Sequence, residues 1–117
     1  MQSMPSRPAD GALRDILYHN DLATQFVQVF DRNKFKDDTR TVYAVTCCLE
    51  IISEASRRLP EDLIARHPSI TWKQTAGAGN VYRHDYEDVA AQFVWDSVQL
   101  ALPRLRIVVE QELARLA

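Results

Sequence analysis

The apolar residues of this 117-residue chain recur mostly at three- and four-residue steps, the spacing typical of amphipathic helices. The first such segment runs from about residue 10 to residue 30, with Asp10 as its expected N-cap. Two polar residues, Asn20 and Thr24, interrupt the stripe, so either part of this face lines a cleft or both side chains simply reach solvent. The stripe itself consists of Leu13, Ile16, Leu17, Ala23, Phe26, Val27 and Phe30.

A second helix is predicted over residues 39–59, after a charged connector at residues 31–38. It carries two apolar rows, which make it apolar over more than half of its circumference. A helix of that kind buries two sides, one in its own bundle and the other, we expect, against a second subunit. Glu54 and Arg57 lie on the remaining flank, where a surface pair is expected. The two rows are Val42, Val45, Leu49, Ile52, Ser56, Leu59 and Tyr43, Cys47, Ile51, Ala55.

The second half of the chain predicts a short helix and two longer elements. Pro60 begins the short helix near its N1 position, and His67-Pro68 ends it. The next element starts at residues 69–72, with Ser69 or Thr71 as cap and Trp72 as an apolar anchor. The last helix runs from residues 87–88 to Leu116, and Pro103 should kink or locally unhook it. Its stripe is Val94, Val98, Leu102, Leu105, Val109 and Leu116.

These elements predict an all-α fold, a four- to five-helix antiparallel bundle in one domain over residues 10–117. Residues 1–9 contain two prolines and no apolar run, so they are expected to be a flexible tail rather than a signal peptide. No stretch is apolar for long enough to span a membrane. The neighbouring Cys47 and Cys48 are expected to be small core residues of a reducing compartment, which predicts a cytoplasmic protein.

The charge balance bears on nucleic-acid binding. The formal net charge is −2, and 26% of the residues are charged. A sequence pI near 5.9 shows no global basic field. A protein that holds DNA mainly through charge would carry such a field, so no DNA partner is expected. A nuclease with a small basic cleft on an acidic body is still compatible with this composition.

The stretch from Ala76 to Tyr86 carries the chemistry. If it is helical, Asn80 and His84 lie one turn apart on one face, and Arg83 flanks His84. A histidine beside an arginine is a minimal set for metal-free phosphodiester cleavage, because the imidazole moves a proton while the guanidinium neutralises phosphate charge. The alternative is that His84 is an ordinary hydrogen-bonded surface or interface group.

A metal site would need His84, Asp85, His67 or His19. These residues have no ligand-type spacing, and His67 precedes a proline in a loop. We therefore expect neither a metal nor another cofactor.

The chain resembles the HepT-like family of HEPN-domain proteins. The similarity extends from Leu13 to Leu116, in the right order and with the right spacings. It is carried by LEIISEASRRLP at 49–60, ARHPSITW at 65–72, Ala76-Gly77, Asn80, His84-Asp85-Tyr86 and Val94-Trp95.

The resemblance implies a compact homodimer of HEPN type that acts as a toxin and cleaves RNA without metal. It also implies a neutralising partner, a small nucleotidyltransferase of the MNT type. The family motif is an arginine, a polar residue, three variable residues, a histidine, one residue and a tyrosine. The polar position falls on Asn80, the histidine on His84 and the tyrosine on Tyr86. By the same resemblance, the partner attaches adenylate groups to Tyr86, and two copies of the motif form one cleft across the dimer interface.

The sequence departs from the motif at Gly79, which stands where the family has its arginine. Losing such a group costs several kcal/mol of transition-state stabilisation. Glycine also loosens a helix by about 1 kcal/mol relative to alanine. Three explanations stay open: Arg83 supplies the guanidinium, the chain is a naturally inactive relative, or it is a variant disarmed for expression.

Two functions follow as expectations. The first is a metal-independent RNase toxin of a HEPN/MNT toxin–antitoxin pair, or its inactivated form, with His84, Asn80 and Arg83 as catalytic residues. The alternative is a non-catalytic helical dimer that binds a nucleotidyltransferase partner or a nucleotide. Gly79 and the acidic pI favour the alternative.

Overall fold

The computed structural model describes residues 6–77 and 88–117, and these residues form helices and connecting turns without any strand. The prediction of an all-α fold is therefore confirmed for this part of the chain. Residues 72–77 are helical as well. The named elements are α1 (Ser6–Val27), α2 (Arg32–Asp37), α3 (Thr39–Ser56), α4 (Glu61–Arg66), α6 (Asp88–Asp96), the π-helix η1 (Ser97–Ala101) and α7 (Leu102–Leu116).

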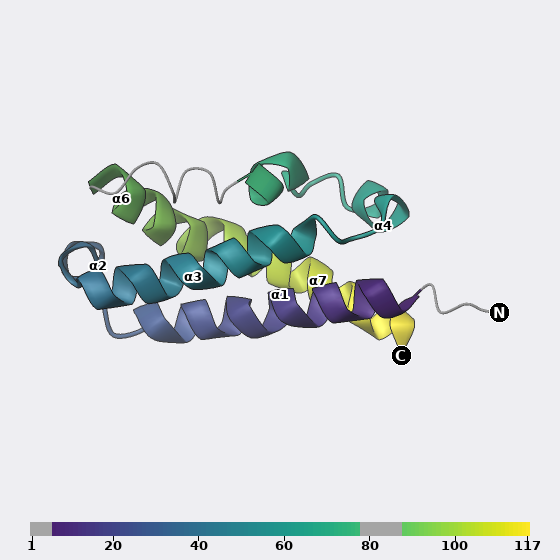
Figure 1. Ribbon diagram of the computed structural model, residues 1–117, viewed down its shortest axis with the longest axis horizontal. Coiled ribbons are helices and arrows are strands. Elements are labelled where there is room, and N and C mark those ends of the chain that lie inside the picture. Colours follow the sequence, from purple (N-terminus) through teal and green to yellow (C-terminus); the bar gives the residue numbers. More distant parts are fainter. Residues whose placement is uncertain (1–5, 78–87) are drawn as a thin grey trace.

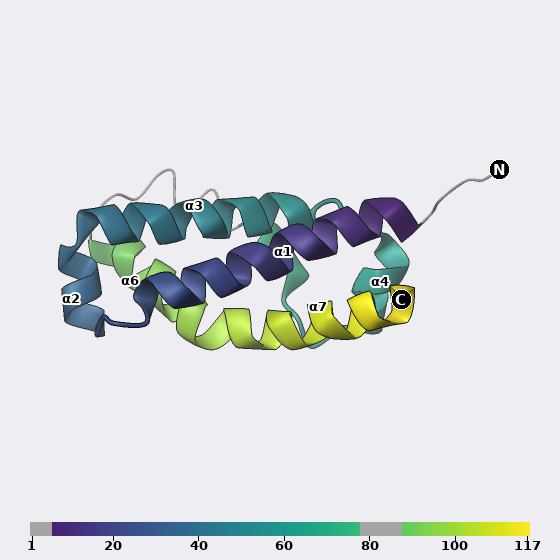
Figure 2. The same ribbon diagram turned by 90° about the horizontal axis from the view of Figure 1, so that it is seen from below.

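The long helices lie side by side along the molecule, with α1 packed against both α3 and α7 (Figures 1 and 2). The chain runs along α1 in one direction and returns along α3, and α7 is also antiparallel to α1. Helix α2 closes one end of this arrangement, and α4 lies at the other end, near the C-terminus. The expected antiparallel packing is thus seen in the α1–α3 and α1–α7 pairs.

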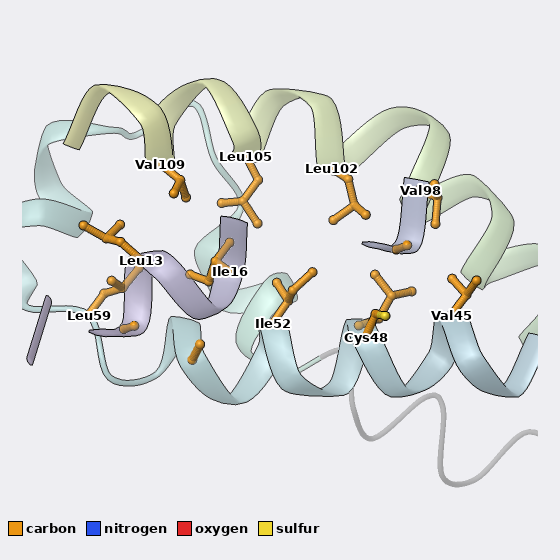
Figure 3. Packing of buried hydrophobic residues seen from close by; sticks show 14 of the residues in the cluster. Leu13, Ile16, Val45, Cys48, Ile52, Leu59, Val98, Leu102, Leu105 and Val109 are labelled. Atoms are coloured by element: carbon orange, nitrogen blue, oxygen red, sulfur yellow. The ribbon is translucent and has the colours of Figure 1, made fainter. Parts of the chain in front are cut away.

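The apolar stripes of the three long helices meet in one core between α1, α3 and the η1–α7 segment (Figure 3). Leu13 and Ile16 of α1 are almost completely buried, as expected from the stripe. On α3 the first predicted row is buried from Val45 onward, and it continues to Leu59. The spacing of apolar residues therefore identified the packed faces correctly.

Helix α1 begins earlier than the sequence pattern indicates. It starts at Ser6, so Asp10 lies inside the helix, where its carboxylate pairs with Arg14 one turn later at 2.9 Å. Ala9 is already buried in the core. Pro8 does not prevent this start, because a proline in the first helical turn removes an N–H that has no partner within the helix.

The connector predicted at residues 31–38 is a short helix, α2, so that prediction was wrong in detail. Asp31 caps it by accepting a hydrogen bond from the backbone N–H of Lys34 at 2.8 Å. Phe35 is fully buried, and its ring lies 5.3 Å from that of Trp95 on α6. A single aromatic anchor among charged residues gives no periodic signal, which is why the pattern missed this element.

The last helix is locally unhooked before Pro103, as predicted. Residues 97–101 form a π-helix, in which the N–H of Leu102 bonds the carbonyl of Ser97 five residues back. Proline has no N–H to donate, so the regular α-helical ladder cannot pass through it. The stripe then resumes in register with buried Leu102, Leu105 and Val109, although Leu116 at the helix end is exposed.

The sequence leaves open whether the Asn20 side chain lines a cleft or reaches solvent, and the structure shows that it does neither. Its side chain is 1% exposed, and its amide nitrogen donates to the carbonyl oxygen of Leu102 at 2.9 Å. It therefore neither lines a cleft nor reaches solvent, and it ties α1 to the start of α7. Thr24 is exposed and its hydroxyl donates to the carbonyl of Asn20 in its own helix.

Candidate functional site

The candidate catalytic and modification residues, Gly79, Asn80, Arg83, His84 and Tyr86, all lie outside the described residues. The structure describes the chain on both sides of them, at residues 72–77 and from Asp88 onward. We can therefore state how the residues that flank this stretch are held, and which surfaces surround them. Four described features bear on the site.

The first is the carbonyl oxygen of Ala76, which is bound by two side chains of α3. The hydroxyl of Ser53 donates to it at 2.8 Å, and a terminal nitrogen of Arg57 donates to it at 2.6 Å. The same nitrogen of Arg57 also lies 3.2 Å from the Ser53 hydroxyl oxygen. Carbonyl groups near the end of a helix need partners outside the helical ladder, and here α3 provides them. The chain is thus fixed two residues before the undescribed stretch.

The second feature anchors the other end of the helical residues 72–77. The indole N–H of Trp72 donates to the backbone carbonyl of His67 at 2.9 Å. The ring nitrogen Nε2 of His67 in turn lies 2.6 Å from a carboxylate oxygen of Glu112 on α7. Trp72 is also packed against the core, so it is the apolar anchor that the sequence predicts. Its hydrogen-bond partner His67 in turn contacts Glu112 near the C-terminal end of α7.

The third feature is the Glu112 carboxylate itself, which is 3% exposed. Arg66 binds it with two guanidinium nitrogens, at 2.7 and 3.1 Å. A buried carboxylate is stable only when it is paired and hydrogen-bonded, and Arg66 and His67 together meet that need. Arg66, helped by His67 and opposed by burial, lowers the pKa of Glu112 to about 2.

This lowered pKa predicts an acid-sensitive fold. A carboxylate whose folded-state pKa lies below its unfolded value of about 4.3 stabilises the protein above that value. Its contribution, roughly 3 kcal/mol, is lost as the pH falls from about 5 towards 2. We expect the free energy of unfolding, measured by urea denaturation across this range, to fall by that amount more in the unmodified chain than in Glu112→Gln.

Glu61→Gln provides the matched control, because Glu61 is an exposed glutamate of α4. Its pH dependence should follow that of the unmodified chain. The interpretation would be wrong if Glu112→Gln kept the full pH dependence, since some other group would then cause it.

The fourth feature is a cavity of about 430 Å³ between α3, residues 69–75 and the α6–α7 segment. Its floor is apolar, with Ile52 of α3 and Leu105 of α7 almost completely buried. Polar side chains lie at its rim, among them Gln74, Ser97 and Arg104. The volume lies within the range of small-ligand pockets, and the helical residues before position 78 form one wall.

The remaining candidates occupy ordinary positions. The expectation that both cysteines are core residues was half wrong: Cys48 is buried, but Cys47 is exposed. Burial, together with the neighbouring Cys47, raises the pKa of the Cys48 thiol to about 11.

Among residues 6–77 and 88–117, no three His, Cys, Asp or Glu side chains are gathered as a metal site. Within the same ranges, no helix has the length and apolar character required to cross a membrane.

The sequence interpretation missed the groups that hold this region together. Glu54 and Arg57 do not form a surface pair, because Glu54 binds Arg58 while Arg57 reaches Ala76. Ser53 and Glu112 are two polar anchors that the sequence pattern does not indicate. Their partners lie 23 and 46 residues away in the sequence, and no local spacing reports such contacts.

In a comparison with known proteins, the matching family model and the similar relatives carry the same kind of name. The family description "Ribonuclease HepT-like" matches residues 16–112. The chain is 32% identical over 107 residues to "Putative RNase MJ1380" of Methanocaldococcus jannaschii, which covers 92% of this chain and 98% of that protein. It is 33% identical over 94 residues to "Probable ribonuclease HepT" of Thermococcus cleftensis, covering 80% and 86% of the two chains. No solved structure matches this chain significantly.

Proposed function

This chain belongs to the ribonuclease HepT-like family, and from that premise we propose that it is the RNase toxin of a HEPN/MNT toxin–antitoxin pair. The observation that carries the proposal is the extent of the family match, which includes the whole stretch from Ala76 to Tyr86. Relatives named as RNases, similar over most of their length, support the same activity class. The test is cleavage of RNA, in the presence of a chelator, by the purified chain and by Gly79→Arg, and the proposal fails if neither protein cuts RNA.

The proposed chemistry uses proton transfer at His84. The imidazole takes the proton of a ribose 2′-hydroxyl, the 2′-oxygen attacks the phosphorus, and the bond to the 5′-oxygen breaks. The imidazolium of His84 then gives its proton to the leaving 5′-oxygen, so that the products are a 2′,3′-cyclic phosphate and a 5′-hydroxyl, and no metal takes part. Asn80 is the polar neighbour that positions the phosphate or the imidazole, and Arg83 is the candidate on the same stretch to substitute for the arginine that Gly79 replaces.

We further propose that two copies of the chain form a homodimer with the cleft at their interface. Large apolar side chains are exposed on the single chain, and such side chains support an interface. Tyr43 on α3 is 69% exposed, and so is Leu100 at the rim of the cavity, while Ile107 on α7 is 58% exposed. In the second apolar row of α3, Tyr43 and Cys47 are exposed, whereas Ala55 near the end of the helix is fully buried in the core, so only the first part of this row is open to a partner.

The proposed partner is an MNT-type nucleotidyltransferase that silences the toxin by attaching adenylate to Tyr86. After co-expression with such a partner, intact-mass and peptide mass spectrometry should show adenylate groups on Tyr86. Tyr18→Phe is a suitable control, because Tyr18 on α1 is an exposed tyrosine outside the motif and is not among the side chains named for the interface, and it should leave the modification unchanged. An unmodified Tyr86 in a chain isolated with its active partner would remove this regulatory role.

A second candidate function has one specific observation in its favour, the glycine at position 79. Under this hypothesis the chain is a non-catalytic HEPN dimer that binds its nucleotidyltransferase partner or a nucleotide. Co-purification with the partner, without RNA cleavage and without toxicity in cells, would favour it. Cleavage of RNA by the chain alone would exclude it.

A further inference from the structure

Arg57 is an exposed arginine that neutral oxygen atoms hold in place. It is the C-cap residue of α3, and its side chain is exposed. One terminal nitrogen of its guanidinium bonds both the carbonyl of Ala76 and the hydroxyl of Ser53. Ser53 is 2% exposed and itself donates to the same carbonyl. A buried hydroxyl and a backbone carbonyl therefore hold an exposed guanidinium in one place.

The neighbouring arginine shows how different this arrangement is. Arg58 is neutralised by two carboxylates, those of Glu54 and Asp15, at 3.1 and 2.9 Å. Within residues 6–77 and 88–117, no carboxylate pairs with Arg57, and its described contacts are with neutral oxygens. A guanidinium has five N–H donors, and these contacts use a single nitrogen. The other donors and the charge are thus available for an anion as far as the described residues are concerned.

The place of this guanidinium relates it to the candidate stretch. It binds the carbonyl of Ala76, and Gly79 follows three residues later in the sequence. Beside Gly77 there is open space, since a Cβ at that position would have no heavy atom within 4 Å. A side chain at position 77 would therefore meet none of the described residues, and the exposed Arg57 guanidinium lies one residue away, at the Ala76 carbonyl.

We propose that Arg57, held by Ser53 and the Ala76 carbonyl, is a phosphate-binding residue for RNA and supplies a cation that position 79 lacks. The inference rests on the proposed RNase function and names a residue that the motif does not include. Arginine suits this role because its planar fork binds phosphate oxygens through two parallel hydrogen bonds. Anchoring one nitrogen beforehand also reduces the entropy lost when the phosphate binds.

The test is the binding of a short, fluorescein-labelled, mixed-sequence single-stranded RNA, followed by fluorescence anisotropy at several salt concentrations. All variants carry His84→Ala so that the probe stays intact. Arg57→Gln should weaken binding roughly tenfold, the size expected for a charge-assisted hydrogen bond. It should also lower the slope of log affinity against log salt by about 0.7, because one phosphate contact is lost. Arg14→Gln, which removes an exposed arginine of α1, should change neither quantity.

Two further variants separate charge from anchoring. Arg57→Lys keeps the charge but loses the fork, so the salt slope should stay while the affinity falls. Ser53→Ala removes one anchor and keeps the guanidinium, and it too should weaken binding with the salt slope unchanged. If Arg57→Gln does not fold, as judged by circular dichroism, these two variants still decide, because unchanged affinity in both would overturn the proposal.

The outcomes also separate this inference from the proposed function. If the parent chain binds RNA, and a folded Arg57→Gln binds it with the same affinity and salt slope, then Arg57 serves only to hold Ala76. The inference would then be wrong while the RNase proposal stands. If the parent chain binds no RNA at all, the RNase proposal fails and the role of Arg57 fails with it.

Discussion

Replacing Gly79 with arginine is expected to raise metal-independent RNA cleavage by roughly 10²- to 10³-fold, the usual effect of one charge-stabilising group in the transition state. The family motif has an arginine at this position, five residues before His84 in the sequence. Charge develops on the phosphate during cleavage, and a guanidinium at that point stabilises it more than it stabilises the bound substrate. The measurement is the cleavage rate of a labelled RNA in the presence of a chelator.

Gly77→Arg is the matched control for this experiment. It adds the same side chain two residues earlier, at an exposed glycine where the surrounding space is open. Extra positive charge alone would accelerate cleavage in both variants, whereas a motif effect would appear only in Gly79→Arg. Equal rates for Gly79→Arg and the unmodified chain would show that position 79 is not the missing element.

Replacing His84 with alanine is expected to lower the cleavage rate by roughly 10²- to 10⁴-fold, the usual contribution of a general acid–base group. The effect should be measured in the Gly79→Arg background, where the starting rate is higher. Binding of RNA should change little, because the imidazole acts on protons rather than on phosphate charge. A loss in the rate constant with an unchanged KM would be the kinetic signature.

His67→Ala controls for the loss of a histidine elsewhere in the chain. His67 contacts Glu112 near the C-terminal end of α7. Replacing His67 should therefore lower the free energy of unfolding and leave the rate constant of RNA cleavage per folded molecule nearly unchanged. A cleavage rate that survives His84→Ala would point to a contaminating nuclease or to another proton-transfer residue.

The helical fold was predictable because its evidence is periodic. Burial of Leu13, Ile16, Val45 and Ile52 followed directly from three- and four-residue spacing. The π-helix before Pro103 was also foreseeable, since proline removes a specific backbone donor. The start of α1 and the existence of α2 were not, because they depend on an allowed proline in the first turn and on one buried aromatic residue.

The candidate site was predictable only in part, because its evidence is a family resemblance and a set of contacts between distant residues rather than a periodic pattern. His84 and Arg83 stand out as chemistry-bearing residues, but the role of Tyr86 and the importance of position 79 follow only from the family resemblance. The groups that hold the flanking chain, Ser53 and Glu112, contact residues far away in the sequence. Such pairs depend on how the helices pack, and no periodic pattern encodes them.

We infer that this chain has the scaffold of a metal-independent RNase and that the glycine at position 79 limits its activity. RNA cleavage by the unmodified chain, Gly79→Arg and the double variant Gly79→Arg/His84→Ala, all measured in the presence of a chelator, tests this inference. We expect strong cleavage by Gly79→Arg, weak or absent cleavage by the unmodified chain, and loss of cleavage in the double variant. This inference would be contradicted if neither the unmodified chain nor Gly79→Arg cut RNA.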